Sequence, residues 1–171
     1  MHRRPSIVAC DPGLLGEAIF AFAEQVAPTF AQAFTANGTR NLEEILPRIK
    51  LELCALYLHL FDRDAFLEAG AARNRFADSL FRAVSSEVEE KLGVDPGEFT
   101  DLCNARQVEF SRYKELIAPR GELGGTLFWE FGKKLAFQYE AFNPVAVQAF
   151  IIATTDGYLG LREIVDQIAN L

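Results

Sequence analysis

The sequence predicts an all-α protein, a single-domain antiparallel helical bundle of about six helices. Apolar residues recur three or four positions apart in nearly every segment that lies between glycine and proline residues. Strand signals are scarce, because no stretch sustains an alternation of apolar and polar residues. A length of 171 residues suits one domain. We therefore expect residues 1–171 to form one helical domain, with residues 1–11 as a flexible N-terminal segment.

The first two helices are expected over residues 12–34 and from Leu42 or Pro47 to Ala69. Gly70 follows the second helix and is typical of a helix end. This second helix is apolar almost all round, which predicts a central place in the bundle. Its solvent face is expected along the line formed by Lys50, Tyr57, Asp64 and Glu68.

The third helix is expected over residues 72–92, ending at Gly93. The fourth is expected over residues 96–117. Asp95 and Pro96 predict its start, because aspartate caps the first turn and proline fits the first helical position.

The fifth helix is expected to start near Thr126, a residue that can cap a first turn. It carries aromatic residues on several faces, so we expect it to be central too. The sixth helix is expected to begin at Asn143 and Pro144, again a cap followed by proline, and to continue toward Leu171 with a bend at Gly157 or Gly160.

Polar residues interrupt the apolar faces of four of these helices, among them Glu87 on the third and Glu130 on the fifth. Glu52, His59 and Arg63 share one line on the second helix, because spacings of seven and four residues stack side chains on one face. Arg106 lies in the middle of the apolar face of the fourth helix. The candidate site consists of these residues and two neighbours: Glu52, His59, Arg63, Arg106, Glu109 and Tyr113.

The first interpretation of this cluster is structural. A buried charge costs several kcal/mol unless it is paired, so partners from other helices are expected. We expect Arg106 to pair with Glu52 or Glu87, and His59 to be held by Glu52 or Glu109. Such a network would fix the packing of the helices.

The alternatives are a binding site and a catalytic site. Arg63 or Arg106 could clamp a small anionic or aromatic ligand, and His59 could act as a base. A metal site is not expected, because no Glu-x-x-His motif is present and nearby guanidinium groups repel cations. No cofactor is expected.

Charge and cysteine content exclude several classes of function. The net charge is −7 and the basic residues are scattered, so neither nucleic acid nor a membrane surface is an expected partner. Three cysteines far apart indicate free thiols in the cytoplasm. The apolar run before Cys10 is too short for a secretory signal.

The sequence therefore favours protein–protein interaction without catalysis as the function. Ile152 and Leu159 lie seven residues apart on the polar side of the last helix and form the candidate interface, with another protein or a second copy as the expected partner. The alternative function is a small-molecule or catalytic site built on the candidate residues around His59.

Overall fold

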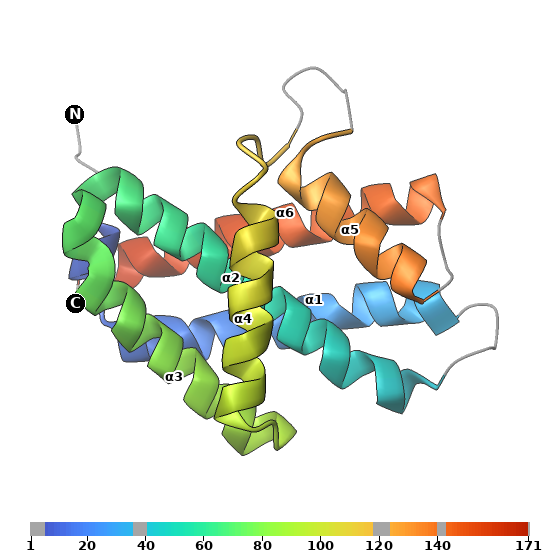
Figure 1. Cartoon of the computed structure of the whole chain (residues 1–171), viewed down its shortest axis with the longest axis horizontal. Helices are drawn as coiled ribbons and strands as arrows, with labels where there is room; N and C mark the ends of the chain where they lie inside the picture. The colour runs from blue at the N-terminus through green and yellow to red at the C-terminus, as the bar shows by residue number, and fades with distance from the viewer. Residues whose placement is uncertain (1–5, 36–40, 118–123, 140–142, 171) are drawn as a thin grey trace.

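The computed structural model describes residues 6–35, 41–117, 124–139 and 143–170 (Figure 1). These residues form helices and connecting segments, and no strand occurs among them. The all-α class is therefore confirmed for the described residues. The elements are η1 (Ile7–Ala9), α1 (Pro12–Thr35), α2 (Leu42–Ala69), η2 (Gly70–Arg73), α3 (Asn74–Leu92), α4 (Pro96–Phe110), α5 (Leu127–Gln138) and α6 (Pro144–Ile168).

Short polar side chains start three of the helices. Asn41 accepts a hydrogen bond from the backbone N–H of Glu43 at 3.0 Å, and Asp95 and Asn143 cap α4 and α6 in the same way. These bonds satisfy backbone donors that the first turn of a helix leaves free. Gly93 ends α3 with a φ of 66°, a conformation that glycine adopts without steric cost.

The helices do not all run alongside one another. α1 packs against α2, α3 and α6, and α5 packs against α6. Figure 1 shows α4 lying across α2, which differs from the regular antiparallel alignment that we expected. This crossing brings the middle of α4 onto the middle of α2, where the polar residues of both helices lie.

The centre of α2 is enclosed on every side. Each residue from Glu52 to Phe61 is buried. Tyr57 has no exposed surface, so the expected solvent face of α2 was wrong at this position. Asp64, on the same line, accepts a hydrogen bond from Arg162 of α6 at 2.9 Å. This line of α2 therefore faces other helices.

Aromatic rings join α1, α5 and α6. The ring of Phe30 in α1 stacks on that of Phe150 in α6, with 4.2 Å between centroids, and meets Phe131 of α5 edge-on at 6.0 Å. All three side chains are nearly or fully buried. Such pairs add to the free energy that burial of their area already contributes.

The start of the chain differs from expectation. Within residues 1–11, residues 1–5 lie outside the described part, but Ile7 is fully buried. The backbone N–H of Ile7 donates a hydrogen bond to Glu68 at 2.7 Å, and the Ser6 hydroxyl donates to the same carboxylate. Residues 6–10 are therefore held against the end of α2, so we correct the expected flexible segment there.

α4 ends at Phe110, seven residues before the expected end at residue 117. The segment that follows is used by other elements. The backbone N–H of Leu127 donates to the carbonyl of Glu115 at 2.9 Å, which caps the start of α5. The carbonyls of this segment are therefore satisfied by contacts with a later part of the chain.

No helix in the described part of the chain is both long enough and apolar enough to cross a membrane.

Candidate functional site

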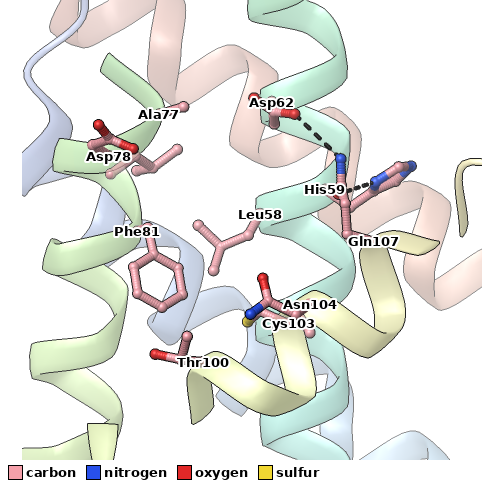
Figure 2. A pocket seen from close by; sticks show the side chains of 12 residues that line it. Leu58, His59, Asp62, Ala77, Asp78, Phe81, Thr100, Cys103, Asn104 and Gln107 are labelled. Atoms are coloured by element: carbon pink, nitrogen blue, oxygen red, sulfur yellow. Dashed lines mark hydrogen bonds between the residues drawn. The ribbon is translucent and has the colours of Figure 1, made fainter. Parts of the chain in front are cut away.

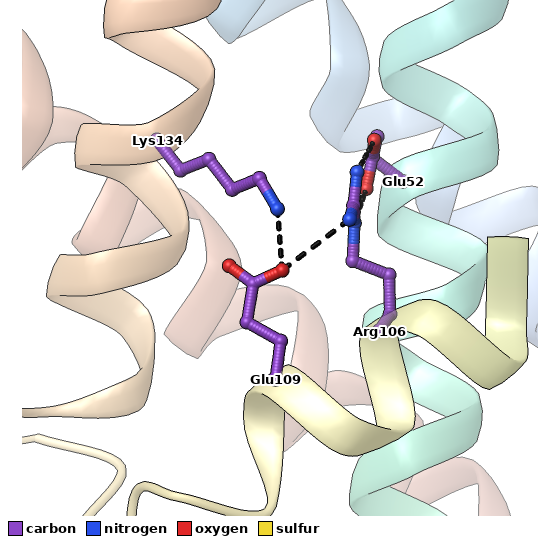
Figure 3. Close-up of polar contacts among 4 residues, drawn as sticks. All are labelled: Glu52, Arg106, Glu109 and Lys134. Atoms are coloured by element: carbon purple, nitrogen blue, oxygen red, sulfur yellow. Dashed lines mark hydrogen bonds and ion pairs between the residues drawn. The ribbon is translucent and has the colours of Figure 1, made fainter.

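A pair of charged residues joins α2 to α4 at their crossing. Arg106 of α4 donates from Nε to Oε2 of Glu52 at 2.6 Å and from Nη2 to Oε1 at 2.5 Å (Figure 3). The predicted pairing of Arg106 with Glu52 is confirmed, and the alternative partner Glu87 instead pairs with Lys91 of its own helix. Two parallel hydrogen bonds of this kind are the strongest arrangement between these groups.

A second carboxylate extends the pair to α5. Glu109 accepts from Arg106 Nη1 at 3.3 Å and from Nζ of Lys134, as Figure 3 shows. The hydrogen bond to Glu52, more than any other contact, raises the pKa of Arg106. Two cations and two anions thus neutralise one another, and the Arg106 guanidinium is committed to protein carboxylates.

Arg63 and Tyr113 do not join this cluster. Arg63 donates to the backbone carbonyls of Tyr113, at 3.3 Å, and of Lys114. Its guanidinium therefore anchors the segment after α4. The contribution of Tyr113 to this contact is its carbonyl oxygen and not its phenol.

His59 is held by Gln107, so the expected partners Glu52 and Glu109 were wrong. Its Nδ1 lies 2.7 Å from Oε1 of Gln107. The amide nitrogen of Gln107 donates to Asp62 at 3.4 Å, and Asp62 also accepts from Arg73 at 2.7 Å. Because the amide nitrogen faces a carboxylate, the amide oxygen faces His59, so Nδ1 of His59 carries the proton.

Burial is the main influence on His59. The residue is 6% exposed and its Nε2 has no hydrogen-bond partner in the described structure. Burial lowers the pKa of His59, and Arg63 lowers it further, whereas Gln107 and Asp62 act in the opposite direction. The imidazole is therefore neutral at pH 7.

The neutral His59 predicts a dependence of stability on pH. The ordinary pKa of 6.5 applies to the unfolded chain, and the folded value is lower, so unfolding takes up a proton below about pH 6.5. The free energy of unfolding should fall as the pH is lowered from about 7.5 to about 5.5. His59→Gln should flatten this slope, as urea titrations at each pH will measure.

An NMR titration of the imidazole protons provides the direct measurement. The sequence contains two histidines, and the other, His2, lies outside the described residues. The variant His2→Asn leaves one signal to follow. A His59 pKa at or above 6.5 would contradict the prediction.

A cavity of about 330 Å³ lies beside His59, between α2, α3 and α4 (Figure 2). Among its lining residues Leu58 and Leu80 are buried, whereas Asp78 and Asn104 are exposed, so its inner side is apolar and its mouth is polar. Neither lysine nor arginine is among the twelve residues that line it. The lining residues are Ala55, Leu58, His59, Asp62, Ala77, Asp78, Leu80, Phe81, Thr100, Cys103, Asn104 and Gln107.

Most polar residues of this cavity were missed from the sequence. Asp62, Asp78, Asn104 and Gln107 occupy positions that the helical period assigns to polar faces, so no interruption of an apolar face marks them. They become neighbours because α3 and α4 pack against α2 and against each other. The sequence contains no pattern that would predict this packing.

Metal chemistry and thiol chemistry find little support. Across the described ranges, no group of three histidine, cysteine, aspartate or glutamate residues is placed to hold a metal ion. Burial, followed by the charge of Glu52, raises the pKa of Cys103 to about 12, so this cavity residue is a neutral thiol.

No protein-family model, curated protein or solved structure matches the chain.

Proposed function

We propose that the protein binds a small molecule in the cavity between α2, α3 and α4. The ligand has an apolar or aromatic body and a neutral or cationic polar end. One observation carries the proposal: the cavity combines apolar lining residues with the Asp78 carboxylate, which has no ion-pair partner among the described residues, and neither lysine nor arginine lines it. Ligand sites in proteins commonly pair an apolar lining with a few polar groups that orient the ligand.

The size of the cavity favours a compact ligand. A volume of about 330 Å³ is near the lower end of the range for small-molecule sites. Leu58, Leu80 and Phe81 contribute side chains to the wall, and Figure 2 shows Leu58 and Phe81 projecting between the helices. A single ring or a short branched chain suits this space better than a long acyl chain.

The charges at the mouth favour a cation over an anion. Asp62 is neutralised by Arg73, but Asp78 has no ion-pair partner within the described ranges. Its carboxylate is therefore available to an ammonium group, with Asn104 on another wall of the cavity (Figure 2). Since Arg63 and Arg106 are committed elsewhere, an anionic ligand, which we considered from the sequence, is less well supported.

Binding without catalysis is the better supported activity. The Cys103 thiol has a pKa of about 12 and is a weak nucleophile at neutral pH. The proton on Nδ1 of His59 is directed to Gln107. The cavity therefore offers recognition groups without an activated nucleophile. A cytoplasmic location is part of the proposal, supported by three free cysteines.

A ligand panel that varies only the polar end tests the proposal. Phenethylamine, phenylethanol and phenylpropionate share an aromatic body and differ in charge. We expect the amine to shift cavity resonances in NMR spectra most strongly, and Asp78→Asn to weaken its binding about tenfold, since a charge-assisted hydrogen bond is lost. Binding of the carboxylate in preference to the amine would contradict the proposed charge.

A variant that fills the cavity provides a second test of the proposed ligand site. Ala77 is half-buried and lines the cavity, so Ala77→Leu should abolish binding by occupying the space. Ala105→Leu is the matched control, because Ala105 lies exposed on α4 and does not line the cavity. If no member of the panel binds, or if both leucine variants bind equally well, the cavity is not the site.

A further inference from the structure

The outer face of α6 carries a line of exposed apolar side chains. Val145, Ile152 and Leu159 are 73%, 62% and 54% exposed. They are seven residues apart and therefore lie almost above one another, over about 21 Å of helix. The opposite side of α6 packs against α1 and α5, so this line faces outward. We name these three residues the α6 line.

Paired helices contact each other through apolar residues at two positions of every seven, and the α6 line supplies one of these two positions. Val145 adds a third member to the two residues that the sequence singled out. Scattered apolar residues on a surface are ordinary, but three in register along one helix make a surface that a second helix can cover.

We propose that the protein forms a homodimer in which α6 packs antiparallel to α6 of a second copy. Ile152 lies at the two-fold axis and contacts Ile152 of the second copy. Val145 then lies near Leu159 of the second copy, and Leu159 near its Val145, because equal spacing on both sides of Ile152 makes the line self-complementary. This inference does not depend on the ligand cavity, which lies between other helices.

The charges of α6 favour a second copy as the partner and select the antiparallel direction. Residues 143–155 contain no charged side chain, whereas Asp156, Glu163 and Asp166 follow on the outer side. Antiparallel packing places this acidic half against the uncharged half of the second copy. Glu163 and Asp166 then lie near the N-terminus of the other α6, whose dipole favours negative charge. Parallel packing would instead place each acidic residue beside the same acidic residue of the second copy, where the two negative charges repel each other.

The contact area between the two copies sets the expected affinity of the dimer. A single helix face spanning about four turns is smaller than the interfaces of permanent dimers. A reversible dimer is therefore expected, with a dissociation constant of about 10–100 µM. Its formation depends on protein concentration in the micromolar range.

Sedimentation velocity over a concentration series measures this association. Ile152→Glu places two carboxylates at the two-fold axis and should weaken association at least tenfold. Val108→Glu is the matched control, because Val108 is 64% exposed on α4, away from the α6 line. A wild-type protein that stays monomeric at millimolar concentration, or a Val108→Glu variant that is weakened equally, would overturn the dimer.

Cysteine cross-linking tests the direction. Single variants Val145→Cys and Leu159→Cys, carrying tags of different mass, are mixed and oxidised. The antiparallel dimer predicts a disulfide between the two different variants and little product from either alone. Cross-linking of each variant to itself, without the mixed product, would indicate parallel packing and overturn the proposed arrangement. Unchanged circular dichroism of both variants establishes that they fold.

Discussion

Replacing Arg106 with alanine is expected to lower the free energy of unfolding by about 3 kcal/mol. The substitution leaves Glu52, itself 7% exposed, as a buried charge without its principal partner. Removing one member of a buried pair typically costs about 3–5 kcal/mol, and we expect the lower end because both side chains keep some contact with solvent, at 15% and 10% exposure. Urea unfolding at pH 7 measures the change.

Two further variants distinguish the effect of a buried ion pair from that of a more exposed ion pair. Lys133→Ala removes the partner of Glu130 on a more exposed part of α5 and should cost less than about 1 kcal/mol. The double variant Glu52→Leu with Arg106→Met should recover most of the stability, because apolar residues can replace a buried ion pair without leaving a charge. An Arg106→Ala loss no greater than that of Lys133→Ala would contradict the prediction.

Gly157→Ala is expected to lower the free energy of unfolding by about 2 kcal/mol, although alanine is the better helix former. A Cβ at Gly157 would overlap the hydroxyl of Tyr57 and lie 3.1 Å from Cγ2 of Val26. Tyr57 is fully buried and cannot move away. Thermal and urea unfolding measure the loss.

Removing the hydroxyl should rescue this variant. The Tyr57 hydroxyl has no hydrogen-bond partner in the part of the chain that the structure describes, so Tyr57→Phe loses no such bond. We expect Tyr57→Phe with Gly157→Ala to recover most of the lost stability. Gly160→Ala is the matched control, since its Cβ would meet the half-buried ring of Phe22, which can shift. An equal loss at both glycines, or no rescue, would count against the explanation.

Some features were predictable because their causes are local. Asp95 and Asn143 bond to backbone groups two residues away, so the starts of α4 and α6 follow from the adjacent residues. The pairing of Arg106 with a carboxylate of another helix was predictable for a different reason. A guanidinium on an apolar face requires an anion, whatever the arrangement of the helices.

Other features depend on contacts between distant segments. The helical period places Tyr57 on a polar line, but α1 packs against α2 and Gly157 of α6 lies against the Tyr57 hydroxyl, and Tyr57 is fully buried. α6 is one uninterrupted helix through Gly157, and this glycine lies in close contact with the hydroxyl of Tyr57. α4 ends at Phe110, and the carbonyls of the segment after it bind Arg63 and the start of α5.

By itself, the sequence determined that the chain is helical, where most of its helices begin, and that Arg106 needs a partner. Those properties depend on hydrogen bonds within a few residues and on the cost of burying charge. Only the tertiary structure decided that His59 binds Gln107 and that a cavity with an acidic mouth lies beside it. Both depend on how α4 crosses α2, and the periodicity within one helix carries no information about such a crossing.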